Sequence, residues 1–232
     1  MSSKSTDALS KGVSTSTKNP GLFVPILAAI VVHLIFLILA YVVFPYRYQF
    51  GFYPFIYEIV VPNPYLIWGG YFIASIIGFI ALCMIVDMTN DIINGRPMNM
   101  SKSMKVVTGR LGTLLVAAII SAIFFLLFFL IPFALFIVVI AIIEGTNAIE
   151  STKRSFDFVI KNLGEVIVFV IIVIVISLIF GIGFSLIPVV GAYIGAIISW
   201  ILNVIFIVSA VYFYLSLRLA APAPPPPPPP PS

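Results

Sequence analysis

Residues 111–143 form a 33-residue apolar run with no charged residue and a single proline, Pro132. A straight helix of this length would extend ~50 Å, whereas the hydrocarbon core of a bilayer is about 30 Å thick. Proline also removes a backbone donor and breaks a continuous helix. We therefore expect the run to double back near Ile131 and Pro132 as a hairpin of two short helices, the second of which need not cross completely.

The composition of the whole chain also indicates a membrane environment. Hydrophobic residues make up 62% of the chain and charged residues 9%, which is too little polar surface to cover a soluble globule. The net charge of +4 is carried by basic residues beside apolar runs, where they orient a membrane protein rather than bind nucleic acid. The single cysteine, Cys83, lies inside an apolar run and provides neither a disulfide framework nor metal-ligand spacing.

The sequence predicts an all-α integral membrane protein, a six-span helical bundle with two interfacial amphipathic helices. The leader, residues 1–21, is rich in Ser, Thr and Lys and is expected to be a disordered cytoplasmic tail. No small-residue cleavage site follows the first apolar run, so we expect a retained anchor rather than a signal peptide. The membrane domain covers residues 22–218, with predicted spans at 22–44, 65–86, 111–130, 132–145, 163–184 and 191–217.

A charged segment, residues 144–165, separates two of these apolar runs. Asn147 followed by Glu150 is a capping-box arrangement, which predicts a helix that begins near Ala148. Its apolar and charged residues fall on different sides, as in a helix that lies along a bilayer surface. The i,i+4 spacing of helical ion pairs occurs at Glu150/Arg154 and at Asp157/Lys161.

A shift of 52 residues superposes residues 103–116 on residues 155–168 with five identities. We interpret the two stretches as copies of one unit, an amphipathic helix followed by a membrane hairpin. The interfacial basic residues of the two copies are Lys102, Lys105, Arg110, Lys153, Arg154 and Lys161.

The distribution of basic residues predicts the orientation. Six spans put eleven of the 12 Lys and Arg residues on one side and only Arg47 on the other. If residues 111–143 crossed once, the division would be seven to five. Because basic residues beside spans favour the cytoplasm, we expect both termini to lie there, in the plasma membrane of a prokaryotic cell.

Three polar side chains, His33, Asn203 and Glu144, are intramembrane candidates for a functional site. The alternative for His33 is a neutral imidazole hydrogen-bonded to a neighbouring helix, which we favour. Asp87 and Asp91 could bind a cation, but a solvated helix end is the preferred reading because no further acidic residue clusters nearby. Small residues at helical spacing predict two close-packing faces, Gly70/Ala74/Gly78 and Gly191/Gly195/Ser199.

Two further segments are distinctive. Residues 45–64 carry many Tyr and Phe residues among four prolines, which predicts an interfacial aromatic belt folded back onto the membrane surface; a ligand-stacking surface is the alternative. The tail, residues 219–232, contains eight consecutive prolines from Pro224 to Pro231. Such a run forms an extended polyproline II rod, which either offers a binding segment to a proline-recognising cytoplasmic protein or serves as a stiff spacer.

The chain resembles prokaryotic polytopic membrane-protein families related to the membrane domain of glycerophosphoryl diester phosphodiesterases. The resemblance rests on EGTNAIESTKRSFDFVIKN (residues 144–162) and NGRPMNMSKSMKVVTGRLGTLL (residues 94–115), and it covers roughly residues 65–218. It implies a six-span bundle of largely unassigned function, with phosphodiesterase activity in a separate soluble domain that is not present here. The leader, the aromatic segment and the polyproline tail depart from the family pattern.

The sequence contains no nucleophile–base pair, metal cluster or glycine-rich phosphate loop, and it implies no cofactor. Our first hypothesis is a non-enzymatic scaffold, anchor or accessory subunit that holds partner proteins or membrane-complex subunits at the cytoplasmic face. The alternative is a small transporter or permease-like subunit, based on the repeat and on mid-membrane His33 and Asn203. A lipid-modifying enzyme, with Glu144 beside a headgroup pocket, is the least favoured hypothesis.

Overall fold

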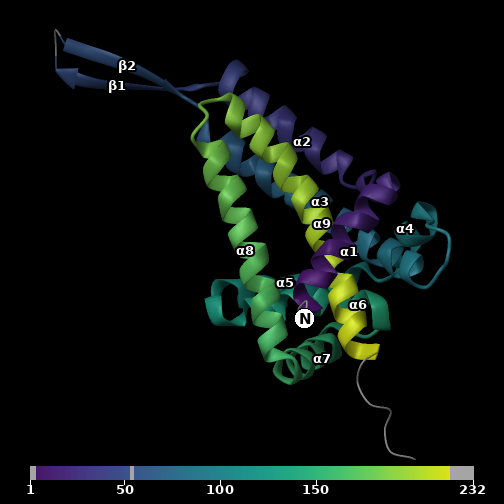
Figure 1. Cartoon of the computed structure of the whole chain (residues 1–232). Coiled ribbons are helices and arrows are strands. Elements are labelled where there is room, and N and C mark those ends of the chain that lie inside the picture. Colours follow the sequence, from purple (N-terminus) through teal and green to yellow (C-terminus); the bar gives the residue numbers. More distant parts are fainter. Residues whose placement is uncertain (1–3, 53–54, 220–232) are drawn as a thin grey trace, which may run out of the picture.

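The longest helices of the protein form one elongated bundle (Figure 1). The computed structural model describes residues 4–52 and 55–219 of the chain. Helix α3 (Pro64–Ile93) packs against α2 (Leu27–Ile38) and α9 (Val190–Leu219), and α9 also packs against α8 (Leu163–Ser185). The shorter helices gather toward one end of the bundle: α4 (Met100–Gly109), α5 (Leu111–Leu126), α6 (Ile131–Glu144) and α7 (Ala148–Lys161).

The described residues include three helices, α3, α8 and α9, that are long and apolar enough to cross a membrane. The number rises to as many as five if the bent pairs α4–α5 and α6–α7 each count as one span. Helix α2, continued by the π-helical turn η2 (Leu39–Val43), is apolar but shorter. The chain is thus a helical membrane protein, while the count of six spans remains a prediction.

The apolar run 111–143 reverses direction near the predicted point. Helix α5 ends at Leu126, a short 3-10 turn η3 (Phe128–Leu130) follows, and α6 begins at Ile131 with Pro132 in its first turn, where a missing N–H costs nothing. At 16 and 14 residues, α5 and α6 are about 24 and 21 Å long, which is short of a bilayer core. Their neighbours turn away sharply, α4 by 77° from α5 and α7 by 119° from α6.

The leader is helical where we expected disorder: residues 4–18 form helix α1 (Lys4–Lys18), which packs against α8 and α9. Its contact face consists of small residues three or four positions apart, including Ser5, Ala8 and Gly12. A Cβ atom at Gly12 would lie 1.9 Å from Ser209 Oγ, so the two backbones approach very closely. The polar composition predicts disorder because it offers little apolar area, but a small-residue face allows close helix packing instead.

The aromatic segment also differs from the prediction, because it forms a two-stranded antiparallel hairpin, β1 (Tyr46–Phe52) and β2 (Phe55–Val61). The hairpin projects from the end of the bundle opposite α7 (Figure 1). Tyr, Phe, Ile and Val favour extended backbone, and Pro45 and Pro62 flank the strands, where proline disturbs no ladder hydrogen bond. This hairpin is the exception to the all-α prediction among the described residues.

Four phenylalanines join the ends of α6, α7, α8 and α9. The rings of Phe169 and Phe213 stack with centroids 4.8 Å apart, and Phe136 meets Phe158 edge-on at 4.9 Å. All four side chains are buried. This aromatic cluster fixes the helix ends that carry the charged residues described next.

Candidate functional site

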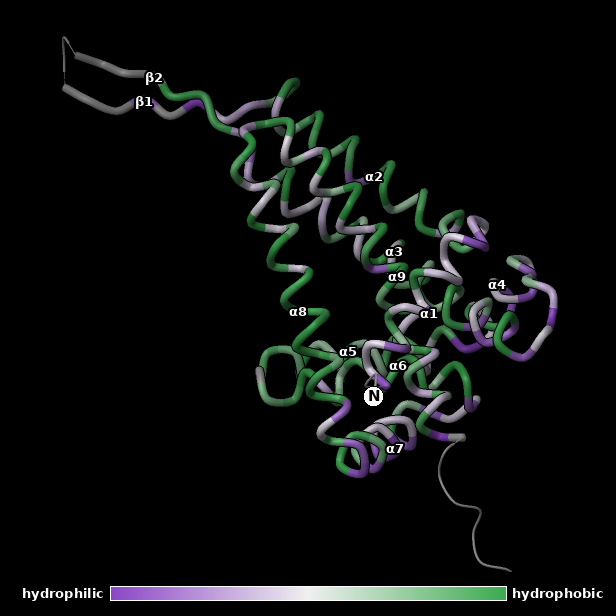
Figure 2. Tube along the Cα trace, viewed as in Figure 1, coloured by the Kyte–Doolittle hydropathy of each residue, from purple (hydrophilic) through white to green (hydrophobic). Residues whose placement is uncertain are grey.

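Hydrophilic residues collect at one end of the molecule, over α1, α4, α7 and the last turn of α9, whereas the upper parts of α2, α8 and α9 are hydrophobic (Figure 2). Two groups of charged side chains stand out there. One joins α3 to α4 and is named here the α3–α4 junction. The other joins α6, α7 and α9 and is named the α6–α7 junction.

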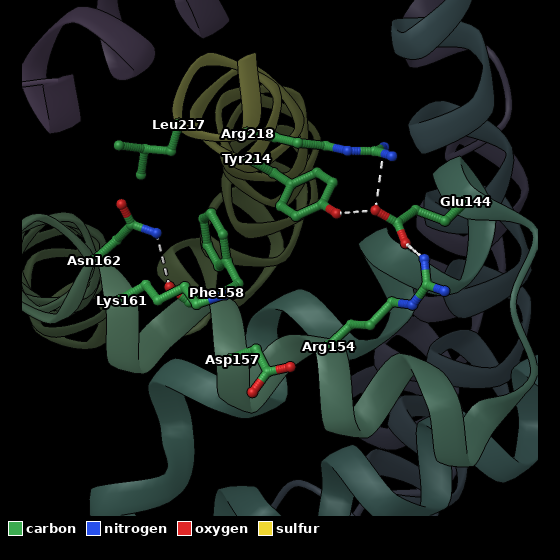
Figure 3. A pocket seen from close by; sticks show the side chains of 9 residues that line it. All are labelled: Glu144, Arg154, Asp157, Phe158, Lys161, Asn162, Tyr214, Leu217 and Arg218. Atoms are coloured by element: carbon green, nitrogen blue, oxygen red, sulfur yellow. Dashed lines mark hydrogen bonds and ion pairs between the residues drawn. The ribbon is translucent and has the colours of Figure 1, made fainter. Parts of the chain in front are cut away.

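At the α6–α7 junction a cavity of about 370 Å³ opens between the helix ends (Figure 3). It is lined by three cations and two carboxylates together with apolar and amide side chains. The lining residues are Glu144, Arg154, Asp157, Phe158, Lys161, Asn162, Tyr214, Leu217 and Arg218.

Glu144 is the centre of this junction, with a side chain only 6% exposed. The Tyr214 hydroxyl donates to its Oε1, which also lies 3.1 Å from Nη1 of Arg218, and Arg154 Nη1 donates to its Oε2. The side chains of Arg154 and Arg218 are themselves 44% and 50% exposed. A single buried carboxylate therefore joins three helices and leaves two cations facing the cavity (Figure 3).

Local sequence explains how α7 presents these groups. Gly145 adopts a left-handed conformation, φ +68°, that ends α6, and the Asn147 side chain accepts from the Glu150 N–H at 2.9 Å, so α7 begins at Ala148 as predicted. Arg154 Nε donates to Glu150 at 2.9 Å, which confirms that predicted pair. Hydrogen bonds to Glu150 and then Glu144 raise the pKa of Arg154 above its ordinary value.

The other predicted pair of α7, Asp157 with Lys161, does not form. Neither side chain has a hydrogen bond or ion pair with any residue in the described part of the chain. In Figure 3, Asp157 points away from Lys161. Lys161 is therefore an unpaired cation at the edge of the cavity.

The α3–α4 junction also holds a buried carboxylate between two cations, but all of its residues lie within a shorter stretch of chain. Asp91, 1% exposed, lies 2.6 Å from Lys102 Nζ and 2.7 Å from Arg96 Nε. Next to it, the Ser103 hydroxyl donates to buried Asp87 at 2.6 Å. Our expectation of a solvated helix end was wrong, because α3 continues to Ile93 and α4 folds back over both carboxylates.

The remaining predicted basic residues have different surroundings. Arg110 donates to the carbonyl oxygens of Ala141 at 2.6 Å and Thr146 at 2.5 Å, and so satisfies backbone groups at the end of α6. Lys105 and Lys153 are exposed and have no partner among the described residues. Of the predicted interfacial basic residues, Lys102, Arg110 and Arg154 therefore make structural contacts. The others, Lys105, Lys153 and Lys161, have no partner among the described residues.

His33 and Asn203 are not brought together. Trp200 Nε1 donates to His33 Nδ1 at 3.2 Å and the Tyr71 ring meets the imidazole edge-on, as the neutral-imidazole alternative predicts. Asn203 is exposed and lines an apolar groove of about 400 Å³ along α8 and α9, which His33 does not line. No three His, Cys, Asp or Glu side chains in the described ranges are arranged to hold a metal ion.

The glycine positions lie at helix contacts. A Cβ at Gly70 would lie 2.1 Å from Phe36 Cβ, and one at Gly78 would lie 2.4 Å from the Trp200 ring, while Ala74 between them is fully buried. Gly191 and Gly195 face Phe184 at the turn from α8 to α9, but Ser199 is exposed. The proline tail, including Pro224 and Pro231, lies outside the described residues.

Sequence reasoning missed the partners of Glu144. Tyr214 is 70 residues away along the chain, and no local pattern connects it with α6. A basic residue closing an apolar helix, Arg218, was the only available signal. Comparison of the chain with protein-family models, with curated proteins and with solved structures finds no match.

Proposed function

We propose that this chain is a non-enzymatic multi-pass membrane protein that anchors or organises partner proteins at the cytoplasmic face. The observation that carries the proposal is the gathering of charged residues at one end of an otherwise apolar bundle (Figure 2). Eleven of the 12 Lys and Arg residues belong to segments at that end. Under the positive-inside rule, this end faces the cytoplasm.

The polar end is well suited to presenting a binding segment. Its ion pairs at Asp91 and Glu144 fix α4 and α7 against the bundle, and α1 is attached through Ser5, whose hydroxyl donates to Glu165 at 2.8 Å. Helix α9 ends at Leu219 at the same end, so the polyproline segment that follows starts from a fixed platform. A stiff polyproline rod loses little entropy when a partner binds it.

Deletion of residues 220–232 tests this role. The full chain and the deletion variant are purified from native membranes in mild detergent, and copurifying proteins are quantified. A second variant replaces residues 224–231 by a Gly/Ser segment of equal length, which keeps the length of the tail but removes its prolines. The proposal expects both variants to lose the same cytoplasmic proteins; unchanged recovery of every partner contradicts it.

The second candidate is a small transporter or permease-like subunit, favoured by correspondences between the proposed repeat units. Ser103 and Ser155, equivalent under the 52-residue shift, are both fully buried, as are Val107 and Val159. Single residues, Arg110 and Asn162, separate each amphipathic helix from the apolar helix that follows. Uptake of candidate solutes into liposomes containing the purified chain tests this role, and flux equal to that of empty liposomes argues against it.

A further inference from the structure

The cavity at the α6–α7 junction and the apolar groove along α8 and α9 lie on one line. On α9, Tyr214 and Arg218 line the cavity, while Ile207 and Ala210 line the groove, at spacings of three or four residues that keep them on one helix face. The aromatic cluster lies between the two, because Phe158 lines the cavity and Phe169 the groove. The charged cavity and the apolar groove thus follow one another along α9, on either side of the buried aromatic cluster, and share no lining residue.

The length of α9 that lines the cavity and the groove matches the thickness of one membrane leaflet. From Arg218 at the charged end to Asn203 at the far end of the groove, fifteen residues of α9 extend about 22 Å. Half the thickness of a bilayer, headgroups included, is about 20–22 Å. A single phospholipid lying along α9 would therefore reach both hollows.

The charges of the cavity favour an anion. Lys161 is unpaired, and Arg154 and Arg218 each retain N–H donors beyond those bonded to Glu144 and Glu150. Glu144 fixes both guanidinium groups in place, so they need little reorganisation to meet a ligand. Three cations against two carboxylates give the lining a net positive charge.

We propose that this line is a binding site for one anionic phospholipid. Its headgroup phosphate accepts hydrogen bonds from Lys161, Arg218 and Arg154, and one acyl chain lies in the groove beside Phe169 and Ile207. An apolar chain displaces no bonded polar group there, because the nearby Ser177 hydroxyl donates to Val173 within its own helix at 2.8 Å. The site does not depend on the proposed partner-anchoring function or on which side the polar end faces.

The headgroup contact is tested with the full chain in nanodiscs of phosphatidylcholine containing a small fraction of phosphatidylglycerol. Native mass spectrometry measures the phosphatidylglycerol retained by the protein. Lys161→Gln is expected to weaken retention about fivefold, the effect of about 1 kcal/mol for one basic contact at a membrane surface. The control Lys153→Gln removes the same charge from the same helix outside the cavity. Because solvent and salt screen a charge without a direct contact to the lipid, retention is expected to change less than about twofold.

The acyl-chain contact is tested by narrowing the groove. Leu178 lines the groove and Ile179 does not, although both side chains are exposed, so Trp is tolerated at either position. Leu178→Trp is expected to reduce phosphatidylglycerol retention several-fold relative to Ile179→Trp. Equal retention by these two variants overturns the assignment of one lipid to both hollows.

Two other outcomes are decisive. Equal losses in Lys161→Gln and Lys153→Gln would show that general surface charge, not the cavity, attracts the lipid, and would overturn the proposal. Inorganic phosphate or glycerol 1-phosphate, added at millimolar concentration, is expected to leave retention unchanged. Displacement of the lipid by either compound would make the cavity a site for soluble phosphates and overturn the lipid assignment.

Discussion

The α3–α4 and α6–α7 junctions both attach a polar helix to the bundle through a buried carboxylate, but the cations that bind the carboxylate come from different parts of the chain. Each holds one buried carboxylate, Asp91 or Glu144, between two half-exposed cations. The α3–α4 junction also buries Asp87, which accepts from the Ser103 hydroxyl. The cations of Asp91 come from the next 11 residues of chain, so the junction closes on itself. Those of Glu144 come from α7 and from distant α9, and the space between these helices stays open as a cavity. The two junctions therefore have the same chemistry and differ in how far apart in the sequence their charged residues lie. The α3–α4 junction is a closed structural contact, whereas the α6–α7 junction leaves a cavity that is a candidate site.

The largest effect on stability is expected for Glu144→Gln. The change leaves Arg154 and Arg218 facing each other without the carboxylate that joins three helices. Breaking a buried pair costs about 3–5 kcal/mol, and solvent around the exposed guanidinium groups favours the lower figure. The melting temperature in detergent should fall by about 9 °C.

Glu150→Gln is the matched control, because Glu150 binds the same Arg154 but is 42% exposed. A loss of about 0.5 kcal/mol, or about 1–2 °C, is expected for such a surface pair. Equal shifts for the two variants would mean that Glu144 does not hold the helices together.

Asp91→Asn should have the next largest effect. Lys102 and Arg96 can both turn out to water once the charge is lost, so about 2 kcal/mol and about 6 °C are expected. Asp7→Asn, which breaks an exposed pair with Lys11, serves as the control and should change the melting temperature by less than about 2 °C. A larger fall in melting temperature for Asp91→Asn than for Glu144→Gln would mean that the α3–α4 junction, not the α6–α7 junction, contributes more to stability.

Tyr214→Phe isolates the hydrogen bond that an uncharged hydroxyl donates to the Glu144 carboxylate. Removing one hydroxyl donor to a carboxylate while both ion pairs remain should cost about 1.5 kcal/mol, measured as a fall of about 4 °C in melting temperature. Tyr65→Phe, at a 77% exposed position, should leave the melting temperature unchanged. Indistinguishable melting curves for the two variants would remove Tyr214 from the junction.

Lys161→Gln should have the smallest effect, less than about 1 °C, because Lys161 has no bonded partner in the described chain. The variant therefore separates stability from binding: the fold stays intact while anionic lipid is lost. A substantial fall in melting temperature would instead make Lys161 a structural residue.

Much of the fold could be predicted from local patterns. Predicted apolar segments 163–184 and 191–217 correspond closely to α8 and α9, and the reversal at Pro132 was expected from helix length and proline chemistry. Helix α3 extends beyond its predicted end because its last turns bury Asp87 and Asp91, whose polarity suggested solvent. Hydropathy detects membrane helices well, but it does not detect polar turns that become buried by a neighbouring helix.

The candidate site was harder to predict than the fold. Glu144 and Arg154 were singled out individually, but their meeting with Tyr214 and Arg218 depends on how α9 crosses α7. Helix α1 was missed for a related reason. Its small residues could be recognised as a packing face only once Ser209 of α9 was known to lie opposite them. Both errors concern contacts between segments far apart in the chain.

The docking of α1 on α9 has a consequence for biosynthesis. Thr15 donates to the hydroxyl of Tyr212, which enters the chain 197 residues later. At roughly 5–20 residues per second, the ribosome needs about 10–40 s to produce that partner. Helix α1 cannot complete its packing until α9 has been made, so during this interval the nascent chain exposes the small-residue face of α1 to chaperones and proteases.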